Sequence, residues 1–305
     1  MAGQVLHLLR PGPGEVAVDC TAGRGGHATA MAEAVGPDGT IVLLDLDASN
    51  LEFAMSRVRS LGRPPRVIGV HANFSQVSAV LQAHGLQADV LLADLGFAST
   101  QMDDPTRGFS FSAPGPLDMR LDASQTLTAR ALLHGLGERE LADLIFEVGE
   151  DPFARRIARS LVERRQAGRL ETTADLAEAV TAAYGSRARA SRVHPATRTF
   201  MAIRIAVNHE LDALDALLSV LGSAAERVGG STGACLADGA RIAFLAFHSL
   251  EDRSIKRAFA DWDRHGWATR LTRKPLVAEL EEQAHNPRAR SAKLRAVRVH
   301  AAAKE

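Results

Sequence analysis

The chain has 305 residues, of which 46% are hydrophobic. This is enough to form the core of one large domain or of two smaller ones. No apolar run is long enough to span a bilayer. It has no signal-peptide pattern, and its two cysteines show no zinc or disulfide spacing, so we expect a cytoplasmic protein without a bound metal or a membrane partner. The formal net charge is zero, but residues 1–150 carry 10 basic and 18 acidic side chains, whereas residues 151–305 carry 26 and 18. The basic second half can supply a nucleic-acid footprint.

The first part of the chain alternates between short apolar runs and helical patterns. Strands are predicted at residues 16–19, 41–45, 66–70 and 88–94, and helices at residues 26–35, 51–61 and 74–84. Strands that alternate with helices at this spacing predict βαβ units in a parallel sheet.

The alternation stops after residue 94. Residues 96–122 resemble a loop, and helical patterns follow at residues 138–148, 152–166, 172–184 and 197–221. Strands resume at residues 241–247, 267–271 and 293–300, with a helix at residues 250–262. We therefore predict an α/β fold, a Rossmann-like sheet of seven strands formed by residues 1–105 and 197–305, with an all-helical domain inserted at residues 106–196.

A glycine-rich loop, "VDCTAGRGGH" (18–27), follows the first predicted strand. Gly23, Gly25 and Ala28 fit the pattern G-x-G-x-x-G/A, and Asp45 lies 22 residues after Gly23, where it can bind ribose hydroxyls. Folds that bind NAD, FAD or S-adenosylmethionine share this pattern, so the loop alone leaves the ligand open.

Three features favour S-adenosylmethionine over a dinucleotide. Asp19 directly precedes the loop, where a carboxylate repels a diphosphate but attracts an ammonium or sulfonium group. Asn73 and Phe74 follow the third strand and can hold an adenine, and Asp94 ends the fourth strand beside the expected crevice. The alternatives are that Phe74 is a core aromatic residue and that Asp19 and Asp45 only cap the helices after them.

Six separated blocks of the chain resemble the RsmH (MraW) family of ribosomal RNA small-subunit methyltransferases. They are "DCTAGRGGH" (19–27), "DLGFASTQMDDPTRGFSFSAPGPLDMRLD" (94–122), "GEDPFARRIARSLVERR" (149–165), "HPATRTFMAIRIAVNHEL" (194–211), "FHSLEDRSIKRAF" (247–259) and "NPRARSAKLRA" (286–296). The resemblance implies a class I S-adenosylmethionine methyltransferase whose inserted helical domain recognises the substrate. The implied reaction is N4-methylation of a cytidine in the decoding region of 16S rRNA within the small ribosomal subunit. A homodimer is one of the expected oligomeric states.

The resemblance also implies which residues bind the cofactor, S-adenosylmethionine. They are Gly25, Gly26, His27, Asp45, Phe74, Asp94 and Gln101. The chain departs from the family pattern in three places: the segment before the first strand is abbreviated, Ala98 replaces the first of two serines, and Cys20 replaces a smaller residue. Only the change at Ala98 lies near the expected chemistry.

Two residues are candidates for catalysis. The exocyclic amine of cytosine is a poor nucleophile, and Asp94 is placed to accept its hydrogen and later its proton. His248 in "FHSLEDR" is the second candidate, as a contact to the base. His248, Ser249 and Asp252 also have the residue types of a hydrolase triad, but they lie in one short turn, where Ser249 is expected to cap the next helix.

Several residues are candidates for RNA binding. Phe109 and Phe111 in "RGFSF" can stack on a base or plug the joint between the domains, and Arg204 and Asn208 are helical neighbours that can grip phosphates or fix the insertion. The cationic candidates in loops and turns are Arg107, Arg198, Arg288 and Arg290. Residues 151–200 add ten arginines against five acidic residues, among them Arg155, Arg156 and Arg159.

Three rival functions are consistent with parts of the sequence. A nicotinamide oxidoreductase would use the glycine loop for NAD, but Asp19 and the blocks after residue 94 argue against it. A non-catalytic RNA-binding assembly factor would have no need to retain Gly25, Gly26, Asp45 and Asp94. The same chemistry on another substrate, such as DNA, is opposed only by the resemblance.

Overall fold

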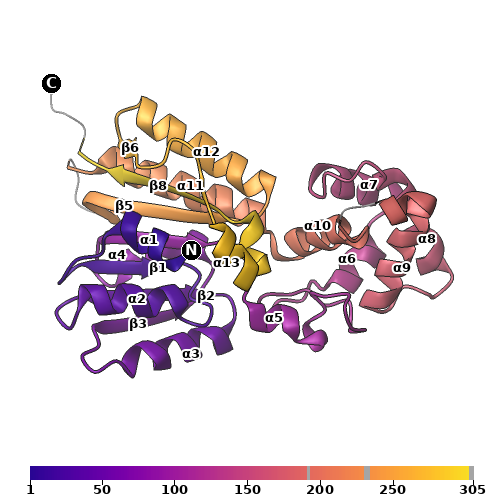
Figure 1. Ribbon diagram of the computed structural model, residues 1–305, viewed down its shortest axis with the longest axis horizontal. Coiled ribbons are helices and arrows are strands. Elements are labelled where there is room, and N and C mark those ends of the chain that lie inside the picture. The colour runs from indigo at the N-terminus through magenta and orange to yellow at the C-terminus, as the bar shows by residue number, and fades with distance from the viewer. Residues whose placement is uncertain (191–192, 230–233, 302–305) are drawn as a thin grey trace. The chain divides into compact units, whose positions relative to one another are not determined.

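The computed structural model describes residues 1–190, 193–229 and 234–301 and divides into two compact units (Figure 1). The sheet unit comprises Met1–Gly96 and Leu211–Glu305, coloured indigo to purple and orange to yellow. The helical unit comprises Phe97–Glu210. It extends further at both ends than the insertion predicted at residues 106–196, because the helix that begins at Ala196 packs on the helices before it.

The sheet has the order β3-β2-β1-β4-β5-β8-β6. β1 to β5 are parallel, and β8 runs antiparallel between β5 and β6. The seven predicted strands are all present, which confirms the Rossmann-like fold, and a two-residue eighth strand beside β8 was not predicted. The strands are β1 (Val16–Asp19), β2 (Thr40–Asp45), β3 (Arg66–His71), β4 (Ala88–Asp94), β5 (Leu236–Ala246), β6 (Ala268–Arg270), β7 (Leu276–Val277) and β8 (Lys293–Val299).

Both faces of the sheet are buried beneath helices. Successive side chains of a strand point to opposite faces, so Ala17 and Leu92 join one apolar cluster while Val18 and Leu91 join the other. Helices α1 (Ala2–Leu9), α2 (Gly26–Val35) and α3 (Ala48–Arg59) contribute to the first cluster, and α4 (Val77–Ala83), α11 (Glu210–Arg227) and α12 (Ser249–Arg264) to the second. A further short helix, α13 (Leu280–His285), follows β7.

The helical unit has its own core. Its helices are α5 (Ser99–Asp103), α6 (Ala129–Gly135), α7 (Glu138–Glu147), α8 (Ala154–Gln166), α9 (Thr173–Tyr184) and α10 (Ala196–Asn208). Apolar residues of α7, α8 and α9 recur at helical spacing and are fully buried, among them Ile145, Ile157 and Val180. In the described part of the whole chain, no helix is both long and apolar enough to cross a membrane.

The single helix predicted over residues 197–221 is wrong. His209 adopts a left-handed conformation (φ 50°), which ends α10 and turns the chain before α11 begins at Glu210. The carboxamide of Asn208 binds Met119 O at 2.7 Å and Leu121 N at 2.7 Å, so the preceding loop fixes the end of α10. Periodicity could not reveal this break, because apolar residues continue on both sides of it.

Candidate active site

The loop between β1 and α2 depends on glycines in left-handed conformations. Gly23 has φ 49° and Gly25 has φ 74°. A Cβ at Gly25 would lie 3.1 Å from the Cα of Ala54 on α3, so this position requires glycine for space as well as for conformation. Arg57 on α3 donates to Arg24 O at 3.2 Å, and α3 therefore supports the loop from outside.

Asp45, at the end of β2, holds the same loop. Its Oδ2 accepts from Gly23 N at 2.7 Å, and its Oδ1 accepts from Asp47 N at 2.8 Å. The alternative that Asp45 caps the next helix is wrong, because Asp47 accepts the N–H groups of Ser49 and Asn50 and caps α3. Burial raises the pKa of Asp45, and the two N–H donors counteract this shift.

Replacing Asp45 by alanine tests its place in the cofactor site. We expect the affinity for S-adenosylmethionine to fall by about 1.5–3 kcal/mol, as for a lost hydrogen bond to a charged group, because the change removes the loop anchor and the predicted acceptor for the ribose hydroxyls. Titration calorimetry measures this change, and thermal unfolding confirms that the variant is folded. Unchanged affinity in a folded Asp45→Ala variant would remove Asp45 from the site.

Three polar side chains, one buried and two partly exposed, meet where β1 and β4 end. Asp19 is 1% exposed, and its Oδ1 accepts from Thr21 N at 3.1 Å. The Nε2 atom of His27, in the first turn of α2, lies 3.6 Å from Asp94 Oδ2. Within the described residues, Asp19 Oδ2, His27 Nδ1 and Asp94 Oδ1 are buried without a hydrogen-bond partner. An unsatisfied buried polar group costs about 1–3 kcal/mol, so three together are typical of a site that is completed by a ligand.

Burial shifts the pKa of all three groups. It raises the pKa of Asp19 to about 7 and that of Asp94 to about 7, and the carboxylates of Asp19 and Glu251 raise that of Asp94 further. It lowers the pKa of His27 to about 4, so the imidazole is neutral at pH 7. None of the three groups therefore carries a positive charge at pH 7, and the N-terminal ammonium of Met1, which pairs with Glu282, is the cation that lowers the pKa of Asp94.

These charges distinguish between the two candidate ligands. A cation beside Asp19 and Asp94 favours their ionised forms and gains Coulomb energy from them, whereas a diphosphate is repelled. S-adenosylmethionine carries an ammonium and a sulfonium group and no phosphate, so the residues present fit it. The 31% of the Asp94 side chain that stays exposed leaves a route for a ligand to reach it. Among the described residues, no three His, Cys, Asp or Glu side chains cluster as a metal site requires.

Phe74 and Asn73 lie at the end of β3, as predicted. Phe74 is half-buried and packs against an apolar cluster of the sheet unit. It therefore contributes to the core, as the alternative held, while part of the residue stays accessible. The Asn73 side-chain oxygen accepts from Ser75 N at 2.9 Å and caps the short 3₁₀ helix Phe74–Gln76. Asn73 therefore has a local structural role, and its contact to adenine stays a prediction.

His248, not Ser249, caps α12. Its Nδ1 accepts from Glu251 N at 3.4 Å, and its Nε2 lies 3.1 Å from Glu251 Oε1. Asp252 instead binds Arg295 on β8, with 2.6 Å between Oδ1 and Nε. His248, Ser249 and Asp252 therefore share the residue types of a hydrolase triad but not its hydrogen-bonded arrangement.

Gln101 and the RNA candidates Arg107 and Phe109 belong to the helical unit, where they have internal contacts. Gln101 accepts from Ala98 N at 2.8 Å and caps α5. Arg107 donates to Arg120 O and Leu121 O, each at 3.0 Å. Phe109 stacks on Phe97 with 5.1 Å between the ring centroids, and Phe111 stacks on His194 at 4.5 Å.

The remaining cationic candidates differ in how far the fold already uses them. Arg204 forms a bidentate pair with Glu210 at 2.8 and 2.9 Å, and Arg198 donates to Glu150 O at 2.9 Å. The contacts of Asn208 described above are also internal to the helical unit. Arg290 is exposed in the sheet unit, on the short helix Pro287–Ser291. The side chain of Arg288 lies outside the described residues.

Sequence reasoning missed two residues that organise the site. Thr21 Oγ1 accepts from Asp94 N at 2.7 Å while Thr21 N donates to Asp19, so one residue joins the ends of β1 and β4. Glu251 is 3% exposed and accepts from Phe247 N at 2.8 Å. A signal for Glu251 was present, because its position three residues after the cap residue is that of a capping box.

A glycine loop surrounded by acidic groups, at the carboxyl edge of a sheet with this strand order, is the arrangement of a methyltransferase that uses S-adenosylmethionine. The chain belongs to the MraW methylase family, whose model matches residues 1–300. It is 46% identical over 299 residues to the ribosomal RNA small subunit methyltransferase H of Sorangium cellulosum, covering 97% of this chain and 88% of that protein. It is 44% identical over 296 residues to the enzyme of the same name from Acidobacterium capsulatum, covering 95% and 94%.

Proposed function

We propose that this methyltransferase modifies the exocyclic N4 amine of a cytidine in the decoding region of 16S rRNA, within the small ribosomal subunit. The observation that carries the proposal is family membership over residues 1–300, with relatives named for methylation of small-subunit ribosomal RNA. Two carboxyl oxygens without a hydrogen-bond partner among the described residues, Asp19 Oδ2 and Asp94 Oδ1, support it, since both a cationic methyl donor and an amine acceptor need such groups.

We assign S-adenosylmethionine to the carboxyl edge of β1, β2 and β4. When bound, it supplies an electrophilic methyl group. Asp45 is suited to its ribose hydroxyls, Asp19 to its ammonium and the half-buried Phe74 to its adenine. The full set proposed for the cofactor is Gly25, Gly26, His27, Asp45, Phe74, Asp94 and Gln101, together with Asp19.

Asp94 is the proposed catalytic residue. The lone pair of the cytosine amine is conjugated with the ring, so a carboxylate that accepts an amine hydrogen bond concentrates the lone pair on nitrogen and then takes the proton. Asp94 Oδ1 has no other hydrogen-bond partner in the described part of the chain, and the pKa of about 7 suits proton transfer at neutral pH. His248 pairs with Glu251, so we propose it only as a positioning residue near this edge.

The cysteines favour methylation at nitrogen over methylation at carbon 5. Transfer to carbon 5 of a pyrimidine needs an accessible thiolate that adds to the ring. The chain has only Cys20 and Cys235; each is 1% exposed, and burial raises the pKa of both. Neither thiol is therefore suited to act as a nucleophile.

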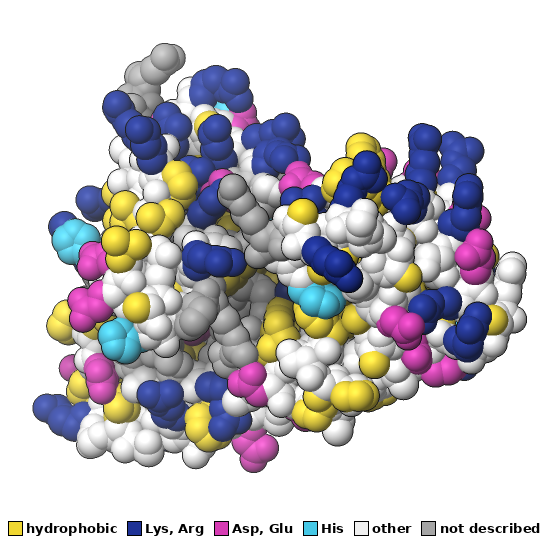
Figure 2. Space-filling model, turned by 45° about the vertical axis from the view of Figure 1, so that its right-hand side comes forward, with side chains coloured by type: hydrophobic (Ala, Val, Ile, Leu, Met, Phe, Trp, Pro, Cys, Tyr) yellow, Lys and Arg dark blue, Asp and Glu magenta, His cyan; other side chains and the backbone are white. Residues whose placement is uncertain are grey.

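The target base must leave its stack, because the site cannot reach an amine inside a duplex. The helical unit is proposed to recognise the surrounding RNA, and residues 151–200 give it ten arginines against five acidic residues. Figure 2 shows Lys and Arg side chains spread over the face in view. Arg290 is the exposed candidate on the sheet unit.

Incubation with labelled S-adenosylmethionine and small subunits from cells that lack the enzyme, followed by nucleoside mass spectrometry, tests the proposal. We expect N4-methylcytidine from small subunits and no product from DNA. A variant in which Cys20 and Cys235 are both alanine should give the same product. Formation of 5-methylcytidine, or loss of activity in the folded double variant, would overturn the assignment to nitrogen. Binding of NAD without S-adenosylmethionine would favour the oxidoreductase.

A further inference from the structure

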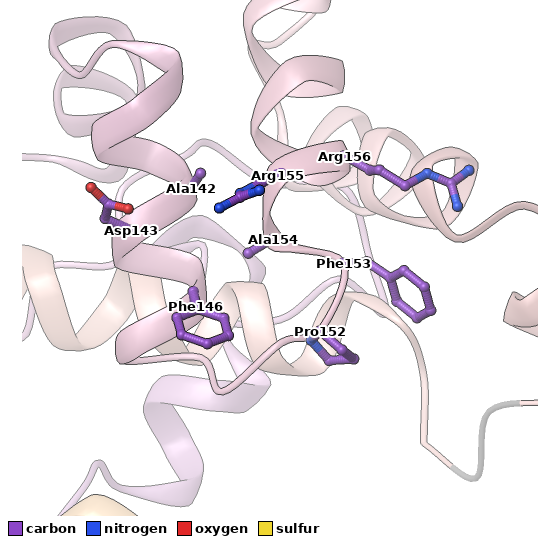
Figure 3. A pocket seen from close by; sticks show the side chains of 8 residues that line it. All are labelled: Ala142, Asp143, Phe146, Pro152, Phe153, Ala154, Arg155 and Arg156. Carbon is purple, nitrogen blue, oxygen red and sulfur yellow. The ribbon is translucent and has the colours of Figure 1, made fainter.

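The helical unit has a pocket of its own, separate from the residues assigned to the cofactor. It has a volume of about 330 Å³ and lies between α7 and the start of α8 (Figure 3). Figure 3 shows Phe146 on α7 across a gap from Pro152 and Arg155 extending toward α7, with Arg156 and Phe153 extending away on the other side. This volume is at the lower end of the range for ligand sites and is large enough for one planar base.

Phe146 is an exposed aromatic residue on a helix whose other face is well buried. Its side chain is 64% exposed, whereas Leu141 and Ile145 of the same helix are at most 1% exposed. The core of the helical unit therefore does not require Phe146, and its ring offers a flat apolar surface to solvent. Single-stranded nucleic acids bind such rings by stacking their bases on them.

The arginines of α8 divide into two groups. Three of the five are already used within the helical unit: Arg159 lies 3.6 Å from Glu138, Arg164 binds Glu178 at 3.1 Å, and Arg165 donates to backbone carbonyls at the end of α6. The other two, Arg155 and Arg156, line the pocket, are exposed and have no hydrogen-bond or ion-pair partner among the residues that the structure describes.

The charge of the pocket is positive overall. Its one acidic side chain, Asp143, lies 3.8 Å from Arg139 one turn earlier on α7, which partly offsets its charge. Arg155 thus presents a guanidinium group on the side of the pocket that carries the exposed ring, and Arg156 presents a second one on the other side. A guanidinium binds phosphate with paired N–H donors, and the ring binds a base, so the two together match a nucleotide.

We propose that this pocket binds one unpaired nucleotide of the RNA substrate, with its base on Phe146 and its phosphates on Arg155 and Arg156. The inference rests on the proposed function, because that function makes RNA the substrate. It adds a contact between the protein and the RNA outside the cofactor site. Single-stranded RNA is favoured over a protein partner because two unpaired cations and an aromatic face complement a phosphate and a base. A duplex does not fit this site, because its bases are stacked and paired in its interior and none of them can enter the pocket alone.

Binding of a fluorescein-labelled single-stranded RNA oligonucleotide by Phe146→Ala and by Arg155→Ala/Arg156→Ala tests this site. We expect Phe146→Ala to raise the Kd about 5- to 150-fold through lost stacking, and Phe146→Trp to restore binding. The double arginine variant should lower the slope of log K against log salt by about 0.7 for each lost phosphate contact. Arg159→Ala removes one positive charge from the same helix outside the pocket, so it is the matched control for the single variant Arg155→Ala.

Calorimetry with S-adenosylmethionine should be unchanged in every one of these variants, which shows that the cofactor site is intact. Wild-type RNA affinity in both Phe146→Ala and the double arginine variant would overturn the proposal. An equal loss in Arg159→Ala would also overturn it, because general charge would then explain the binding. Normal binding of the oligonucleotide with reduced methylation of assembled subunits would assign the pocket to a protein instead. If the pocket variants lose RNA binding while the wild type methylates no subunit RNA, the proposed function is wrong but the pocket is still an RNA-binding site.

Discussion

Asp94→Asn is expected to lower the single-turnover rate of methyl transfer at saturating cofactor by roughly a hundredfold or more, a larger effect than its loss of cofactor affinity. Asparagine keeps the shape of the side chain and accepts one hydrogen bond, but it cannot take a proton from the amine. The Asp94 side chain is 31% exposed, its Oδ1 has no hydrogen-bond partner among the described residues and its Oδ2 lies 3.6 Å from His27 Nε2, so the exchange breaks no tight internal pair. Rapid-quench transfer to small subunits at saturating S-adenosylmethionine measures the rate.

Asp19→Asn is the matched control for this prediction. It removes a carboxylate of similarly raised pKa from the end of β1, and we expect it to weaken cofactor binding more than it lowers the saturated rate. The opposite result for Asp94→Asn, weak binding with a normal rate at saturation, would make Asp94 a cofactor ligand alone. A variant that is normal in both assays would remove Asp94 from the mechanism and direct attention to His248.

The affinity for S-adenosylmethionine is expected to rise steeply between pH 6 and pH 8. Burial holds the pKa values of Asp19 and Asp94 at about 7, so both carboxyl groups are largely protonated at pH 6. A cationic ligand favours their ionised forms and must displace these protons, which weakens binding by about tenfold for each group at pH 6 relative to pH 8. His27, with its pKa lowered to about 4, stays neutral over this range and contributes nothing to the change.

Calorimetry in buffers of different ionisation enthalpy should detect proton release on binding near pH 7. In Asp94→Asn, the pH dependence should fall to that of one carboxyl group. The ligand-free protein should show the opposite trend in stability. Because the folded pKa values lie above the usual value of about 4, the native state binds more protons than the unfolded state between pH 4 and pH 7, and these two groups make it less stable as pH rises. A flat affinity across pH 6 to 8 would show that neither group meets a cation.

The sheet was predictable because its signals are local. Each of the first four strands is a short apolar run between helical patterns, and the acids at their ends, such as Asp45 and Asp94, fall at the carboxyl edge in any parallel sheet of this kind. The glycines of the loop were also recognisable from their spacing. The structure gives the physical reason at Gly25, which has a left-handed conformation and a close neighbour.

The errors came from interactions between residues far apart in the sequence. The end of α10 at His209 is set by Asn208, whose side chain binds Met119 in a loop 89 residues earlier in the chain. The internal pairing of Arg204, which was one of the predicted alternatives, depends instead on the local turn after α10 that brings Glu210 back to it. Composition and periodicity carry no information about such pairs.

The sequence by itself determined the fold class, the position of the glycine loop and the acidic groups around it, because strand ends and left-handed glycines follow from local chemistry. Only the tertiary structure decided which polar atoms stay unpaired: it left Asp94 Oδ1 and the Arg155 and Arg156 guanidiniums without partners in the described chain, while it gave partners to Asn208 and Arg204. The reason is physical. A side chain is available for function only after the folded neighbours have satisfied or ignored its hydrogen-bonding groups, and those neighbours are set by three-dimensional packing.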